Sequence, residues 1–116
     1  PRSALAPDPQ PDGPVPGLRS VASMSSGFEH SCAVTHAGKV YCWGRNNIGQ
    51  LGDGTTTYSV EAHEVVNLHD ALQVSCGREH SCALTRDGSV YCWGSNVKGE
   101  LGDGTMNERH TPVRVL

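Results

Sequence analysis

The sequence has few aromatic side chains, no long apolar run and no block of basic charge. Aromatic residues make up 5% of its 116 residues, and no stretch approaches the roughly 20 apolar residues that a membrane-spanning helix needs. Its 9 basic residues are outnumbered by 12 acidic ones and form no cluster that would meet the phosphates of DNA or RNA. We therefore expect neither membrane insertion nor a nucleic-acid partner.

A sustained helical period is also missing. Apolar residues instead alternate over short runs separated by glycine, as where Cys82 and Leu84 fall on one parity and Ala83 on the other. Alternation with a period of two predicts β-strands. The segment 61–72 could pass for a weak helix, but we interpret it as an edge strand, a connection and the start of the next strand.

Proline is concentrated near one end of the chain. Six of the seven prolines lie in residues 1–16, which contain almost no large apolar side chain. Because proline lacks a backbone N–H and such a segment cannot bury an apolar face, we predict a disordered tail or linker there.

The remaining sequence consists of two similar copies of one segment. Residues 17–66 align with residues 67–116 without a gap, and nearly half of the aligned positions are identical. A tandem repeat with a period of 50 residues predicts two copies of one structural unit.

Each copy contains a predicted hairpin with one cysteine on each strand. In the second copy, a three-residue loop ends at Gly88, in the left-handed conformation that glycine adopts at little cost. This register places Cys82 opposite Cys92, and β-carbons at such positions lie about 4.5 to 5.5 Å apart, close enough for a disulfide after modest adjustment. The first copy repeats the arrangement with Gly38, Cys32 and Cys42. The sequence therefore predicts two disulfides, one in each repeat.

The fifth cysteine, Cys76, has Ser26 at the equivalent place in the first copy. The repeat gives it no partner, and we interpret it as a buried thiol. Two disulfides predict an oxidising compartment, either extracellular or periplasmic. The alternative is that all five cysteines are reduced core residues of a cytosolic protein.

Each repeat is long enough for one four-stranded blade of a β-propeller. Tyr41 and Trp43 point to one face of such a sheet while Val40 and Cys42 point to the other, so both faces need a neighbour. We predict an all-β fold of two four-stranded antiparallel blades, belonging to a propeller that is incomplete or is completed by an oligomer.

Two matching phrases, VYCWGRNNIGQLGDGT and VYCWGSNVKGELGDGT, are each preceded by a Gly-x-x-His-Ser-Cys-Ala element. Together they resemble repeats of the regulator of chromosome condensation family over residues 17–116. The resemblance implies a propeller, usually of seven blades, so two repeats cannot close the ring and need more repeats or further copies of the chain. It also implies structural roles for His30, His80, Trp43 and Trp93, with each histidine ordering a turn between strands. The paired cysteines resemble those of a secreted bacterial variety of these repeats.

This resemblance favours a non-enzymatic module that binds proteins or assembles with its own kind, without a cofactor. A rigid scaffold would present variable loops to a partner, although drift on solvent-exposed turns is an equal explanation for the variation. The candidate loop residues are Asn47, Ile48, Tyr58, Val97, Lys98, Met106, Asn107 and Arg109. Family members also suggest two alternatives, namely nucleotide exchange on a small GTPase and inhibition of a secreted enzyme.

Reactive constellations have simpler explanations. A zinc site built from His30, Cys32 and Cys42 lacks both the short Cys-x-x-Cys knuckle and a fourth ligand, so we expect no metal. An active site needs one catalytic pair, whereas the spacing of His80 and Cys82 recurs in both copies. We therefore expect no enzymatic activity. The two Leu-Gly-Asp-Gly-Thr segments lack the following helix or the ladder of oxygen ligands of a phosphate or calcium site, and we interpret them as turns.

Overall fold

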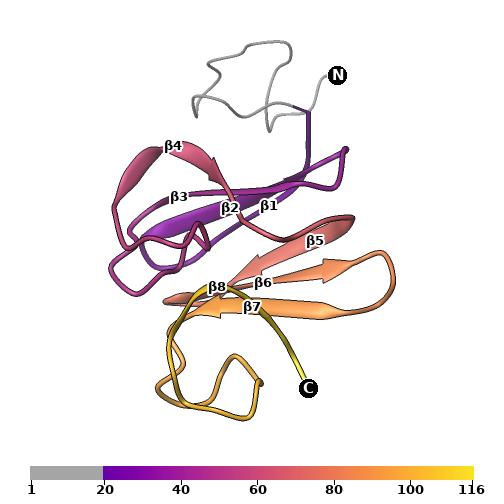
Figure 1. Cartoon of the computed structure of the whole chain (residues 1–116). Helices are drawn as coiled ribbons and strands as arrows, with labels where there is room; N and C mark the ends of the chain where they lie inside the picture. The colour runs from indigo at the N-terminus through magenta and orange to yellow at the C-terminus, as the bar shows by residue number, and fades with distance from the viewer. Residues whose placement is uncertain (1–19) are drawn as a thin grey trace.

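Each repeat forms one four-stranded antiparallel sheet in the computed structural model, which describes residues 20–116 (Figure 1). The first sheet, blade 1, has the order β1 (Val21–Ser26), β2 (His30–Thr35), β3 (Val40–Gly44) and β4 (Ser59–Glu64). The second, blade 2, has the order β5 (Ala71–Cys76), β6 (His80–Thr85), β7 (Val90–Gly94) and β8 (Arg109–Arg114). The predicted all-β class is confirmed, whereas the predicted tail at residues 1–16 lies outside the described residues. Within residues 20–116, no helix is long and apolar enough to cross a membrane.

The central hairpin of each blade has the predicted register. Cys32 pairs with Cys42 on β2 and β3, and Cys82 pairs with Cys92 on β6 and β7. At the tip of the second hairpin, Gly88 has a φ of 88° and donates its N–H to the carbonyl oxygen of Thr85 across 3.0 Å. Because only glycine adopts this conformation cheaply, its position fixes the loop length and hence the register.

The segment that resembled a weak helix is extended, as interpreted. β4 ends at Glu64, β5 begins at Ala71, and the connection between them buries Val65 and Leu68. The outer strands β4 and β8 overlap the segments in which the two copies differ most, 56–64 and 106–114. Both are outermost strands that pair on one side only, so they lack the alternating pattern of a half-buried strand.

The two blades stack face to face, with β5 against β1 and β2 (Figure 1). Each blade has a Trp face, which carries the alanine, tyrosine and tryptophan of its central hairpin. On the opposite side is a Cys face. It carries Cys32, Val34, Val40 and Cys42 in blade 1 and Cys82, Leu84, Val90 and Cys92 in blade 2. The Cys face of blade 1 and the Trp face of blade 2 form the main core, whose buried residues include Cys32, Val34, Val40, Cys42, Ala83 and Trp93. Among residues 20–116, no further sheet packs on the Trp face of blade 1 or on the Cys face of blade 2, and we call these two the open faces.

Candidate functional site: the blade seam and the open faces

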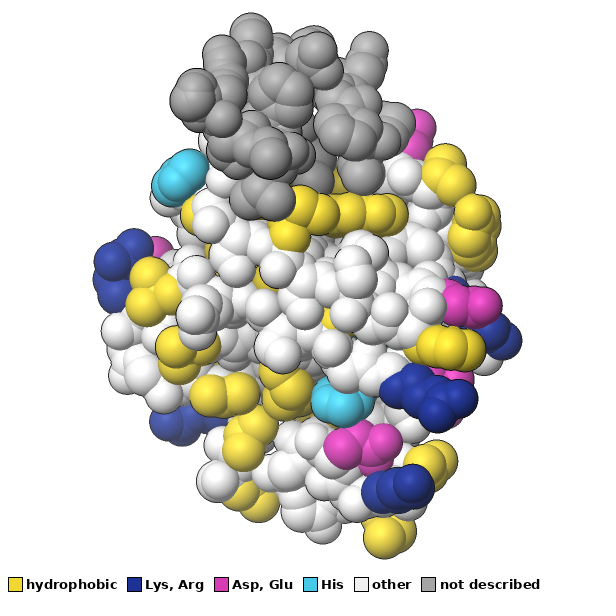
Figure 2. Space-filling view, turned by 180° about the vertical axis from the view of Figure 1, so that it is seen from behind, with side chains coloured by type: hydrophobic (Ala, Val, Ile, Leu, Met, Phe, Trp, Pro, Cys, Tyr) yellow, Lys and Arg dark blue, Asp and Glu magenta, His cyan; other side chains and the backbone are white. Residues whose placement is uncertain are grey.

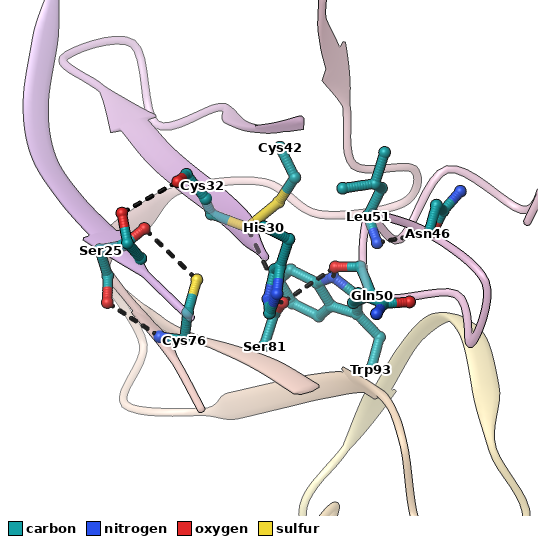
Figure 3. Close-up of a disulfide and its surroundings, with 12 residues drawn as sticks. Ser25, His30, Cys32, Cys42, Asn46, Gln50, Leu51, Cys76, Ser81 and Trp93 are labelled. Atoms are coloured by element: carbon teal, nitrogen blue, oxygen red, sulfur yellow. Dashed lines mark hydrogen bonds between the residues drawn. A yellow bond between two sulfur atoms is a disulfide. The ribbon is translucent and has the colours of Figure 1, made fainter. Parts of the chain in front are cut away.

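A buried chain of hydrogen bonds crosses the seam between the blades (Figure 3). The carbonyl oxygen of Gln50 in blade 1 accepts the indole N–H of Trp93 across 2.8 Å and the hydroxyl of Ser81 across 2.9 Å. Since the single hydroxyl proton of Ser81 is used there, its oxygen accepts from Nε2 of His30, which lies 2.8 Å away. His30 of blade 1 is thus joined to blade 2 through Ser81. Sequence reasoning missed both Ser81 and Gln50, because their roles depend on how the sheets stack.

His30 does two things at once. Its carbonyl oxygen accepts the N–H of Gly27 across 2.7 Å, which closes the turn between β1 and β2. Its ring, however, leaves that turn and enters the seam, where the residue is 3% exposed. Burial lowers the pKa of His30 to about 4, so the imidazole is neutral at pH 7.

The sulfur atoms of each cysteine pair lie at bonding distance. S–S is 2.09 Å for Cys32–Cys42 and 2.10 Å for Cys82–Cys92. The remaining cysteine, Cys76, was expected to be buried and is only partly buried. It belongs to β5 of blade 2 but contacts blade 1. Its N–H donates to the hydroxyl oxygen of Ser25 across 2.9 Å, and its thiol donates to the carbonyl oxygen of Ser25 across 3.5 Å (Figure 3). Burial raises the pKa of the Cys76 thiol to about 11, so it is uncharged at neutral pH.

The two Leu-Gly-Asp-Gly-Thr segments form turns, each organised by a buried asparagine. In blade 1, Oδ1 of Asn46 accepts the N–H of Leu51 across 2.9 Å, and its Nδ2 donates to the carbonyl oxygens of Thr55 and Thr57. These bonds hold Leu51 in the core. Asn96 makes the matching bonds in blade 2. The sequence analysis did not identify either asparagine, although both copies have asparagine at this position.

The open faces expose side chains that the seam buries. Trp93 is fully buried, whereas Trp43 at the same position of blade 1 is partly exposed on the open Trp face with Tyr41. On the open Cys face of blade 2, Leu84 and Val90 are partly exposed, whereas their blade 1 equivalents are fully buried. A groove of about 370 Å³ runs beside Cys82, Leu84 and Val90.

The candidate loop residues differ in their surroundings. Tyr58, Val97 and Met106 have large exposed fractions of 65%, 70% and 69%. Asn47, Lys98 and Asn107 are exposed too. Ile48 is partly buried instead. Arg109 is not a loop residue, since it begins β8 and its Nε donates to Oδ2 of Asp103 across 2.9 Å.

A further exposed pair was not found from the sequence. The guanidinium of Arg78 lies 4.8 Å from the centroid of the Phe28 ring, and the Phe28 N–H donates to the Arg78 carbonyl oxygen across 3.1 Å. These residues occupy equivalent turns of neighbouring blades, so the contact is one more bond across the seam. On the face drawn in Figure 2, basic and acidic side chains lie interspersed, and apolar side chains are exposed at several places.

Comparison with known families gives two matches along the chain. Both are profiles described as the regulator of chromosome condensation (RCC1) repeat. One matches residues 37–84 and 87–116, and the other matches residues 21–50 and 72–100. Both matches are double, in agreement with the tandem repeat.

Individual proteins match over parts of the chain. Human E3 ubiquitin-protein ligase HERC2 is 49% identical over 45 residues, which are 37% of this chain and 1% of HERC2. The crystal structure of human WBSCR16 has a TM-score of 0.74 at 31% identity, covering 81% of this chain and 25% of that one. Prp20p from Saccharomyces cerevisiae has a TM-score of 0.77 at 20% identity, covering 88% and 27%. The chain therefore spans about a quarter of the two solved structures and a far smaller part of HERC2.

Proposed function

Because the chain belongs to the regulator of chromosome condensation repeat family, we propose that it is a non-enzymatic protein-binding and assembly module. Its two open faces bind further blades of the same repeat, and its exposed loops bind a protein partner. The observation that carries this proposal is the hydrogen bond from Trp93 to the Gln50 carbonyl oxygen. The open Trp face carries an equivalent donor, and the open Cys face carries an equivalent acceptor.

The halves are complementary in chemistry. The open Trp face of blade 1 carries Trp43 and Ser31, the counterparts of the two seam donors Trp93 and Ser81. The open Cys face of blade 2 carries His80 and the carbonyl oxygen of Glu100, the counterparts of His30 and of the acceptor on Gln50. The change from Gln50 to Glu100 does not weaken the match, because the backbone supplies the acceptor.

This pairing joins unlike surfaces. The Trp face of one pair of blades fits the Cys face of the next, so the contact is heterologous and joins the chains head to tail. The repeats of a solenoid or propeller generally cover one another in this way, since a single sheet cannot bury both faces alone. In the isolated chain, the additional blades come from a second copy.

The loops supply the second part of the proposal. Exposed Tyr58 and Met106 are residue types enriched in protein interfaces. Prp20p, whose fold this chain shares, has described binding properties to Gsp1p and histones. That precedent supports a protein partner for the loops. The two disulfides support an oxidising compartment as the place of action.

Sedimentation equilibrium tests the assembly part. We expect the wild-type chain to associate as its concentration rises, and we expect Trp43→Glu to weaken this association at least tenfold by placing a charge on the open Trp face. Val97→Ser is the matched control, because it removes an exposed apolar side chain from a loop and should leave association unchanged. A wild-type chain that stays monomeric, or an equal loss in both variants, would refute the proposal.

A further inference from the structure

The seam also contains a compact group of soft metal ligands. A ring nitrogen of His30 and the Sγ atoms of Cys32 and Cys76 all lie within 4.8 Å of one another. His30 and Cys32 come from β2 of blade 1, whereas Cys76 comes from the end of β5 in blade 2 (Figure 3). A fourth donor is adjacent, because Sγ of Cys42 is bonded to that of Cys32. Three sulfur atoms and one imidazole therefore meet where the blades touch.

The imidazole has an unused donor atom. Nε2 of His30 is protonated because it donates to Ser81, so Nδ1 carries a lone pair. Among the described residues, Nδ1 of His30 is the one buried side-chain nitrogen or oxygen without a hydrogen-bond partner. Leaving such an atom unsatisfied costs about 1 to 3 kcal/mol.

We propose that His30, Cys32, Cys42 and Cys76 bind one Zn²⁺ ion when the Cys32–Cys42 disulfide is reduced. Three thiolates and one imidazole are a common set for a closed, four-coordinate structural zinc site. Bond lengths of about 2.3 Å to sulfur and 2.0 to 2.1 Å to nitrogen place tetrahedral ligand atoms roughly 3.5 to 3.8 Å apart. The bonded sulfurs of Cys32 and Cys42 must therefore separate, and the other ligand atoms must draw together. The ion would join blade 1 to blade 2 in place of the disulfide.

A dithiol reductant gives two electrons and two protons to the Cys32–Cys42 bond, which breaks into two thiols while the reductant becomes a disulfide. Zn²⁺ then displaces one proton from each of three thiols, and the neutral imidazole contributes its lone pair without losing a proton. Binding therefore releases three protons and tightens as the pH rises.

The second repeat provides an internal control. His80, Cys82 and Cys92 stand in blade 2 as their counterparts do in blade 1, but the third sulfur of such a group comes from the blade that follows. Blade 1 itself has Ser26 where blade 2 has Cys76. The described residues hold one group of at least three potential metal ligands, so one ion is expected per chain.

Titration of the full chain with Co²⁺, an absorbing probe for zinc sites, tests the proposal. We expect the anaerobically reduced chain to bind one Co²⁺ with the strong absorption of thiolate ligation and to release it to Zn²⁺. Cys76→Ser should weaken this binding at least tenfold, whereas a chain carrying both Cys82→Ser and Cys92→Ser should bind as the wild type does. Circular dichroism of each reduced variant checks that the sheets persist.

Three results would overturn the zinc site. The first is a reduced chain that binds no Co²⁺. The second is equal weakening by Cys76→Ser and by the Cys82 and Cys92 substitutions, which would indicate unspecific binding by thiols of a loosened chain. The third is equally tight binding by the oxidised chain, because its Cys32 and Cys42 cannot supply thiolates.

Discussion

Trp93 of blade 2 donates its indole N–H to the carbonyl oxygen of Gln50 in blade 1 across 2.8 Å, and both residues are buried. Trp43 occupies the same place in the first repeat, but the face around it is open. The chain therefore contains two equivalent tryptophans, of which Trp93 is buried and hydrogen-bonded in the seam and Trp43 is partly exposed. The same substitution at Trp43 is therefore a control for the effect of a substitution at Trp93 on stability.

The first prediction compares the two tryptophans. Trp93→Phe removes a buried hydrogen bond and part of a packed ring, and we expect it to lower the free energy of unfolding by about 1 to 3 kcal/mol. Trp43→Phe makes the same chemical change on the open face and should cost less than about 1 kcal/mol in the monomer. Urea unfolding at low protein concentration measures both values. Equal losses would mean that the seam bond contributes nothing of its own.

The second prediction compares the hairpin tips. Gly38 and Gly88 both have positive φ, so alanine is strained at either position by about 1 kcal/mol. A β-carbon on Gly38 would lie 3.0 Å from Cα of Asp70, whereas one on Gly88 meets nothing within 4 Å. Gly38→Ala should therefore lower the midpoint of thermal unfolding more than Gly88→Ala does. A larger effect at Gly88 would contradict the packing of the first tip against the connection to blade 2.

The hairpins and the seam differ in how far the sequence predicts them. Local chemistry fixes the register, because Gly88 must end the loop and Cys82 must then face Cys92. The seam depends on residues 31 to 51 positions apart, and no local pattern links Gln50 to Trp93. The strand β8 shows little alternation, because it is an outermost strand that contains Pro112, and pairing with β7 stabilises it.

The third prediction concerns pH and applies to the metal-free chain with both disulfides intact. Burial lowers the pKa of His30 to about 4, whereas an unfolded imidazole has a pKa near 6.5. Between these values the unfolded state binds a proton that the folded state does not, so the free energy of unfolding falls as the pH drops through this window. The loss is at most about 3.4 kcal/mol.

His30→Gln should flatten this dependence relative to the wild-type chain. Urea unfolding at a series of pH values between about 4 and 7 makes the comparison. Hydrogen bonds from His63 and Thr55 lower the pKa of Asp53. The stability that such carboxylates contribute is lost at lower pH than that of His30, because it is lost only as they become protonated. An unchanged slope in His30→Gln would assign the pH dependence to other groups.

The fourth prediction counts the thiols. Intact mass after alkylation should show one modified cysteine in the denatured, unreduced chain and five after reduction. In the folded chain, Cys76 should react slowly, because burial both shields the thiol and raises its pKa to about 11. Five alkylated cysteines without reduction would remove the support for an oxidising compartment.

Each loop closed by a disulfide contributes at most about 2.7 kcal/mol by chain entropy. Removing Cys32–Cys42 should cost more than removing Cys82–Cys92, because the first pair is fully buried in the seam and its loss leaves a cavity. Urea unfolding of the two double alanine variants measures the difference.

Mixing two blocked chains tests the assembly of the open faces most directly. Trp43→Glu blocks the Trp face and leaves the Cys face intact, whereas Leu84→Glu blocks the Cys face and leaves the Trp face intact. We expect each variant alone to sediment as a monomer and the equimolar mixture to form a one-to-one dimer, because one intact face of each kind is then available. A mixture that stays monomeric, or a dimer formed by either variant alone, would contradict the head-to-tail stacking of blades.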